Sequence, residues 1–143
     1  MKSTKVVLIK GGIHEDDRGI LAFANEFDMT QVRRFYQIKH TNTQTIRAWQ
    51  GHKIERKWFY CSEGSFLVNV IEIDDWVHPS PNLQVQTFTI AASKPQVLSV
   101  DGGCVTGLQA LENNSALMVF SDMDTLQSKA DDFRFDKDLW YKW

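Results

Sequence analysis

The sequence predicts a single all-β domain, a barrel or a sandwich, that spans residues 1–143. Short segments rich in Val, Ile, Phe, Tyr, Trp and Thr recur along the chain, and clusters of Gly, Pro, Asn and Asp separate them. Many short strands at this spacing are typical of these two architectures. A chain of 143 residues builds one hydrophobic core, and no long helical period appears before residue 125.

Ten strands are expected, each bounded by turn residues or by a change of pattern. In chain order they are Lys5–Lys10, Gly19–Glu26, Arg33–His40, Thr45–Lys53, Lys57–Cys61, Ser65–Asp74, Gln84–Ile90, Gln96–Val100, Thr106–Glu112 and Ala116–Ser121. The turns between them include Gly11-Gly12, Asp16–Gly19, Glu63-Gly64, Pro79–Asn82, Asp101–Gly103 and Asn113-Asn114. Only Asp124–Phe133 has helical character, so a short C-terminal helix is predicted, with Asp or Thr as its N-cap.

Charge and cysteine content narrow the class of protein. The net charge is −2 and the basic residues form no continuous stripe, which argues against a nucleic-acid-binding surface. No apolar run approaches the length of a membrane span. Cys61 and Cys104 each lie in an apolar stretch, so we expect buried free thiols. These features indicate a cytoplasmic protein.

The segment 47–64 resembles the first motif of the cupin fold, a double-stranded β-helix or jelly-roll barrel. That motif places a His-x-His pair, then an acidic ligand, then a glycine seven residues after the acid. Here Gln50 and His52 occupy the pair, Lys57 stands at the acidic position, and Gly64 is the glycine. The resemblance implies a cupin-type barrel.

The second cupin motif resembles Asp101–Gly103, and Thr106 stands where the motif has a histidine. Of the four ligand positions only His52 therefore keeps a metal-binding side chain. A cupin metal site needs several imidazole or carboxylate ligands around one ion, and the ammonium of Lys57 replaces one of them. We therefore predict no metal.

A closer resemblance covers nearly the whole chain. The chain is similar to the metal-free sugar-nucleotide cupins, the dTDP-4-keto-6-deoxyhexose 3,4-ketoisomerases and the dTDP-4-dehydrorhamnose 3,5-epimerases. The residues that support it are Asp17–Gly19, Arg33–Tyr36, Arg47–Lys53, Lys57, Gly64, Phe120–Asp122 and Asp132–Phe135. The resemblance implies a homodimer, a nucleotide-linked sugar as substrate and no cofactor.

Neither of these two activities matches every motif position. The chain keeps the arginine, the second histidine and the lysine of the ketoisomerase motif as Arg47, His52 and Lys53. Gln50 replaces the histidine that the epimerases use as their base. Lys57 is typical of the epimerases, because the ketoisomerases have glutamine there. The pattern is a hybrid.

Moving a keto group, or inverting the carbon beside it, begins with removal of a proton next to a carbonyl. His52 is the candidate base, because the ordinary pKa of histidine suits this task. Lys57 or Arg47 is the candidate for stabilising the enolate oxygen, and Tyr36 for returning the proton. Tyr36 is equally compatible with a strand aromatic in the core.

Five further residues are candidates for substrate binding: Arg18, Arg47, Lys53, Gln50 and Thr106. The resemblance places Arg18 near the nucleotide phosphates, and a guanidinium suits a diphosphate because it offers paired donors. Arg18 is also compatible with a role in closing its own turn.

Structural alternatives remain for the other candidates. His52 is compatible with a hydrogen-bonded strand histidine, and Arg47 with an ion pair to Glu55 or Glu72. From periodicity alone, the solvent-facing side of the strand is the favoured place for Lys57.

Three functional hypotheses follow. The first is a sugar-nucleotide isomerase or epimerase that acts on a dTDP-4-keto-6-deoxyhexose by proton transfer alpha to the ketone. The alternative is a non-catalytic cupin that binds a sugar nucleotide, and the third is a barrel with no ligand. The apolar tail with Trp140, Tyr141 and Trp143 is expected to pack on the body or on a second subunit.

Overall fold

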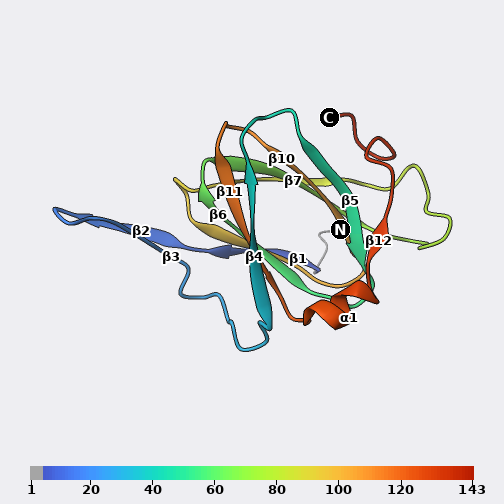
Figure 1. Ribbon diagram of the computed structural model, residues 1–143, viewed down its shortest axis with the longest axis horizontal. Helices are drawn as coiled ribbons and strands as arrows, with labels where there is room; N and C mark the ends of the chain where they lie inside the picture. Colours follow the sequence, from blue (N-terminus) through green and yellow to red (C-terminus); the bar gives the residue numbers. More distant parts are fainter. Residues whose placement is uncertain (1–4) are drawn as a thin grey trace.

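The computed structural model describes residues 5–143, so the first four residues of the predicted domain lie outside the described part. Two five-stranded antiparallel sheets face each other as a jelly-roll barrel, with strand orders β1-β9-β6-β11-β4 and β12-β5-β10-β7-β8 (Figure 1). The elements are β1 (Val6–Lys10), β2 (Gly12–Asp16), β3 (Gly19–Phe23), β4 (Arg34–His40), β5 (Ile46–His52), β6 (Lys57–Glu63), β7 (Ser65–Glu72), β8 (Gln86–Ala91), β9 (Gln96–Val100), β10 (Cys104–Ala110), β11 (Ser115–Ser121), α1 (Thr125–Lys129) and β12 (Phe133–Arg134).

The core lies between the sheets and is built from side chains of the central strands. β6, β7, β10 and β11 are largely buried, which is why their sequences are nearly continuous apolar runs. Core side chains with an exposed fraction of 2% or less include Phe59, Phe66, Val68, Val70, Ile90, Leu98, Leu117 and Val119. Gly64 has φ +67° in the turn between β6 and β7, and a Cβ there would meet the Ser115 side chain.

One side of the barrel is open between two edges. β4 ends the first sheet, and the short β12 ends the second beside β5. α1 precedes β12 and lies at the lower end of this opening in Figure 1. Asp124 caps α1, and the helix stops at Lys129. The edge strands β4 and β12, together with α1, thus border the open side of the barrel.

The predicted all-β barrel and its ten strands are confirmed, with bounds that differ by a few residues. The strand β2 was not predicted, because its glycine and charged residues resemble a turn. β2 pairs with β3 in a separate two-stranded sheet, and the hairpin projects away from the barrel (Figure 1). The predicted helix over Asp124–Phe133 is shorter, because Phe133 pairs with Gly51 of β5.

Both cysteines are free and buried, as predicted. Burial raises the pKa of Cys61 to about 11 and that of Cys104 to about 12, so both are protonated thiols near neutral pH. Within residues 5–143, no helix is long and apolar enough to cross a membrane.

The C-terminal aromatic residues pack on the barrel itself. The rings of Trp140 and Trp143 lie 5.5 Å and 5.6 Å from that of Trp49 on β5. The indole nitrogen of Trp49 also donates to the carbonyl oxygen of Lys137 at 3.1 Å. Of the two places expected for the tail, the body and a second subunit, the structure shows the body, at Trp49 of β5.

Candidate active site

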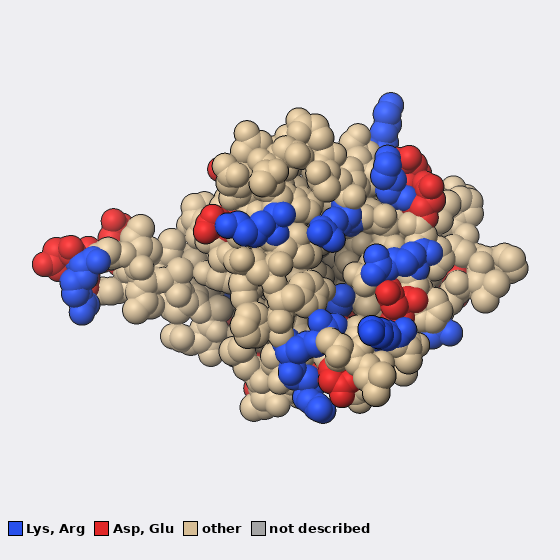
Figure 2. Space-filling view, in the orientation of Figure 1, with Lys and Arg blue, Asp and Glu red and all other residues tan. Residues whose placement is uncertain are grey.

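A cavity of about 700 Å³ opens between β4 and the β5–β12 edge. Its size falls within the range of small-molecule sites. The lining residues are Arg34, Tyr36, Gln37, Ile38, Ile46, Arg47, Ala48, Trp49, Gln50, Lys57, Phe59, Thr106, Leu108, Ser128, Arg134 and Phe135. Four of these side chains are cationic, and none of the described lining residues is acidic. Figure 2 shows Lys and Arg side chains around the hollow of this face.

Five of the predicted site residues line this cavity: Tyr36, Lys57, Arg47, Gln50 and Thr106. They come from β4, β5, β6 and β10, which pair in two different sheets. Only folding brings them together, because up to 70 residues separate them in the sequence.

The other three predicted site residues lie elsewhere. His52 is buried and does not line the cavity. It lies close enough to the cavity residue Lys57 for the charge of Lys57 to affect it. Lys53 is exposed, and its ammonium lies 4.9 Å from the centre of the Phe133 ring. Arg18 is at the tip of the β2–β3 hairpin, where its guanidinium binds Asp16 at 2.6 Å. Within this chain the hairpin tip is remote from the cavity (Figure 1).

Lys57 is buried, with 6% of its surface exposed. The expectation from periodicity, a lysine on the solvent face, was wrong, because the first residue of β6 points between the sheets. Its Nζ donates to the hydroxyl of Tyr36 at 3.1 Å, and no carboxylate of a described residue pairs with it. A buried ammonium with only a neutral partner is costly and strongly attracts an anion.

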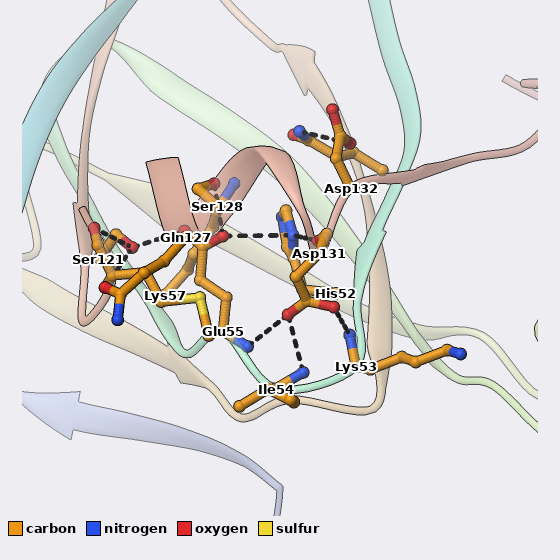
Figure 3. Close-up of polar contacts among 12 residues, drawn as sticks. His52, Lys53, Ile54, Glu55, Lys57, Ser121, Gln127, Ser128, Asp131 and Asp132 are labelled. Atoms are coloured by element: carbon orange, nitrogen blue, oxygen red, sulfur yellow. Dashed lines mark hydrogen bonds and ion pairs between the residues drawn. The ribbon is translucent and has the colours of Figure 1, made fainter. Parts of the chain in front are cut away.

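His52 has one ring nitrogen bound and one unpartnered. Nδ1 lies 2.5 Å from the carbonyl oxygen of Asp131 and 3.3 Å from a carboxylate oxygen of Glu55 (Figure 3). Both contacts are acceptors, so the Nδ1 nitrogen has the proton and Nε2 the lone pair. Nε2 is buried and has no hydrogen-bond partner among residues 5–143. Burial, followed by the charge of Lys57, lowers the pKa of His52 below its ordinary value, so the ring is a neutral base.

Glu55 is a buried carboxylate that the sequence did not single out as a site residue. Oε2 accepts from Ser121 at 2.5 Å and from Arg34 at 3.3 Å, and Oε1 accepts from Ser128 at 2.7 Å. Together with its contact to His52, this network joins β4, β5, β11 and α1 around one negative charge (Figure 3). Glu55 therefore positions Arg34 and Ser128, which line the cavity, and His52, which does not.

Asp131 fixes the loop between β5 and β6. Its carboxylate accepts hydrogen bonds from the backbone N–H groups of Lys53, Ile54 and Glu55, at 2.7, 2.9 and 2.8 Å. Its own carbonyl oxygen binds His52. Asp131, which follows the C-cap of α1, thus sets the position of both His52 and Glu55 (Figure 3).

Arg47 pairs with neither of the expected carboxylates, so that interpretation was wrong. Its Nε donates to Nε2 of His40 at 3.2 Å. Glu55 instead binds Arg34, and Glu72 lies 3.8 Å from the ammonium of Lys5. The register shift between β5 and β10 near Leu108 displaces Arg47 from regular alternation, which periodicity cannot predict.

Two cavity cations, Arg34 and Arg134, were not among the predicted site residues. Both lie in segments that support the family resemblance, so that resemblance was the available signal. Alternation along Arg34–His40 also places Arg34 on the same face as Tyr36.

The four cupin ligand positions do not fit a divalent cation. Gln50 donates to Asp132, Thr106 has only a hydroxyl, and Lys57 brings a positive charge. In the described part of the chain no group of three His, Cys, Asp or Glu side chains is placed to bind a metal ion.

Comparison with known proteins gives matches at the level of structure. No protein-family model and no curated protein sequence matches the chain. Solved structures do match: the RmlC epimerase of Mycobacterium tuberculosis has a TM-score of 0.78 at 18% identity, over 100% of this chain and 76% of that one. The fold is that of the RmlC-like cupins.

Two other RmlC-like structures agree. The dTDP-4-dehydrorhamnose 3,5-epimerase of Bacillus anthracis, solved with TDP and pyrophosphate bound, has a TM-score of 0.78 at 17% identity and covers 98% of this chain and 85% of that one. A variant of the 3,4-ketoisomerase QdtA of Thermoanaerobacterium thermosaccharolyticum, in complex with TDP-4-keto-6-deoxyglucose, has a TM-score of 0.72 at 18% identity, over 94% and 90%. The predicted cupin barrel is thereby confirmed.

Proposed function

We propose that this RmlC-like cupin is a cytoplasmic sugar-nucleotide isomerase or epimerase. It acts on a dTDP-4-keto-6-deoxyhexose by proton transfer at a carbon next to the ketone. The observation that supports this most is the pair formed by buried Lys57 and half-buried Tyr36, because an ammonium without a carboxylate partner among the described residues lies inside a cationic cavity. The solved structures that share the fold, named above, act on or bind substrates of this class.

The first step removes a proton from the carbon beside the ketone. The electron pair of the C–H bond becomes the C=C bond of an enolate, and the carbonyl pair moves to the oxygen. Lys57 stabilises that oxyanion, because its charge is desolvated and not neutralised by a neighbouring acid. No electron leaves the substrate, so this chemistry uses no redox cofactor.

His52 is the proposed base. Its tautomer is fixed with the lone pair on Nε2, and its neutral form is favoured near pH 7. Tyr36 is the proposed acid that returns a proton to the enolate, because its hydroxyl is bound to the same ammonium that stabilises the oxyanion. Return of the proton to the same carbon on its other face inverts that centre. To move the ketone, the former carbonyl oxygen takes up a proton, the hydroxyl on the deprotonated carbon loses its proton and becomes the new carbonyl, and a proton is delivered to the former carbonyl carbon.

Solvent exchange tests the proposal. The protein is incubated with dTDP-4-keto-6-deoxyglucose in heavy water, and deuterium beside the ketone is measured by mass spectrometry and NMR. His52→Asn should lower the exchange rate by about 100-fold or more, which is the usual contribution of a general base. The matched control is His78→Asn, since His78 is exposed on a loop. Equal exchange in His52→Asn and the control contradicts the role of His52.

A non-catalytic sugar-nucleotide-binding cupin is the second candidate. The position of His52 behind the lining residues, and the presence of Gln50 at the first histidine position, favour it. Thermal stabilisation by dTDP without any deuterium exchange would support this candidate and refute the enzymatic one.

We propose further that the protein is a homodimer. Ile13, Ile20 and Leu21 on the β2–β3 hairpin have exposed fractions of 43%, 65% and 59%. An isolated hairpin of this kind is only marginally stable in water, so a second copy is the proposed cover. In such a dimer Arg18 would serve the partner's cavity, because it cannot reach its own. Sedimentation should give a dimer, and Leu21→Asp a monomer; a monomeric wild-type protein refutes the proposal.

A further inference from the structure

The cations of the cavity differ in how their charges are balanced. Two of them have carboxylate partners: Nη2 of Arg34 lies 3.3 Å from Glu55, and Nε of Arg134 lies 2.8 Å from Asp132. Each of these ion pairs has little net charge to offer a ligand. They therefore shape the cavity more than they attract an anion.

The other two cations have neutral partners. Lys57 binds the hydroxyl of Tyr36, and Nε of Arg47 binds Nε2 of His40 at 3.2 Å. Among the described residues this is the only hydrogen bond of the Arg47 side chain. Arg47 is exposed at the mouth of the cavity, so its two terminal nitrogens have no partner within the described part of the chain and are open to a ligand. The uncompensated positive charge of the cavity is therefore concentrated at Lys57 and Arg47.

His40 is a buried histidine whose Nε2 accepts a hydrogen bond from Arg47. The ring is buried, with 4% of its surface exposed, and lies 5.5 Å from the ring of Phe66. Arginine has donors only, so Nε2 of His40 must supply a lone pair and its proton must sit on Nδ1. Nδ1 is buried and has no hydrogen-bond partner in the described part of the chain. A buried donor left unpaired in this way calls for an explanation beyond packing.

We propose that His40 is a positioning residue that orients Arg47 for a phosphate-type anion. The neutral imidazole fixes Nε of the guanidinium and leaves the two terminal nitrogens for a bidentate contact. A carboxylate at the same place would orient Arg47 equally well but would neutralise it. This inference rests on the proposed function, because it assigns the diphosphate of the sugar nucleotide to the Arg47 end of the cavity and the enolate oxygen to Lys57.

A double-mutant cycle tests the inference. Binding of dTDP is measured by calorimetry for the wild type, His40→Leu, Arg47→Ala and the double variant. His40→Leu should weaken dTDP binding about 10-fold, because the orienting hydrogen bond to a charged group is lost. Since His40 acts through Arg47, the double variant should bind no more weakly than Arg47→Ala alone. Multiplied effects, or full affinity in His40→Leu, overturn the inference.

Two further variants separate positioning from folding. His40→Gln presents an amide oxygen to Arg47 and should restore most of the affinity that His40→Leu loses, whereas a purely structural role would give no such rescue. His78→Leu is the matched control, because His78 is exposed, and should bind dTDP like the wild type. In turnover assays the loss in His40→Leu should fall on KM more than on kcat.

A ligand-free measurement keeps this inference distinct from the proposed function. Nitrogen-15 NMR of the histidine rings should show His40 protonated on Nδ1 in the wild type, with the Nε2 resonance shifted in Arg47→Ala. If the wild type does not bind dTDP, the same cycle with inorganic pyrophosphate decides the inference. Absent deuterium exchange with an intact cycle contradicts the proposed function alone; normal exchange with a failed cycle contradicts this inference alone.

Discussion

Replacing Asp131 by Asn tests whether one carboxylate after α1 fixes the site. The carboxylate accepts three backbone hydrogen bonds, from Lys53, Ile54 and Glu55. The asparagine oxygen can keep the two bonds made by one carboxylate oxygen, but its NH₂ group then faces the N–H of Lys53. The substitution preserves the shape of the side chain and removes its charge, so the change in stability reports the hydrogen bonds.

The expected cost follows from these contacts. A hydrogen bond to a charged group contributes about 1.5–3 kcal/mol, and the bond to Lys53 is lost entirely. The bonds to Ile54 and Glu55 become neutral and each lose roughly half of their strength, about 1 kcal/mol. Asp131→Asn should therefore lower the free energy of unfolding by about 3–5 kcal/mol. For a chain of this size Tm should fall by roughly 10 °C or more.

Urea unfolding followed by fluorescence and circular dichroism measures this cost. The control is Asp138→Asn, because the Asp138 side chain is 65% exposed and forms an ion pair with its neighbour Lys137, so its effect should stay within about 0.5 kcal/mol. Deuterium exchange should also fall in Asp131→Asn, since the carboxylate positions the residue whose backbone carbonyl binds His52. A cost below about 1 kcal/mol would refute the reasoning.

The substitution Lys57→Met and a change of pH test the buried charges of the site. Lys57→Met should lower deuterium exchange by about 100-fold or more while the free energy of unfolding stays the same or rises, because a buried ammonium without a carboxylate partner is removed; a loss of 3 kcal/mol in urea unfolding would contradict this. The stability should also depend on pH. Burial lowers the pKa of His40 and of His52, so below about pH 6.5 the unfolded chain binds protons that the native state does not. The free energy of unfolding should therefore decrease as the pH falls from 7 to 5, with a slope of at most about 1.4 kcal/mol per pH unit for each histidine. His40→Gln should reduce that slope, and a flat profile in the wild type would contradict the assignment.

Part of the site could be predicted because motif positions fix the order of residues along strands. Tyr36, Arg47, Gln50, Lys57 and Thr106 were predicted as site residues and do line one cavity. The strand pattern could not rank their partners, because a hydrogen bond between strands depends on register and on bulges. This is why the partner of Arg47 is His40, 7 residues earlier, and not a carboxylate.

The buried polar network could not be predicted at all. Glu55 lies in the β5–β6 loop, where a charged residue is normally solvated. It is buried because Arg34, Ser121 and Ser128 converge on it from three other elements. Such convergence is set by how the sheets close and has no signature in local composition.

The sequence by itself determined the all-β architecture and the replacement of the metal ligands at the cupin motif positions. These depend on local properties: β-branched and aromatic runs, turn residues between them, and the chemistry of side chains at fixed motif spacings. Only the tertiary structure decided which charges face the cavity, which of them are neutralised, and which nitrogen of each histidine is protonated. These properties depend on distances of 2.5 to 3.3 Å between side chains on different strands and loops, and close packing of the two sheets sets those distances.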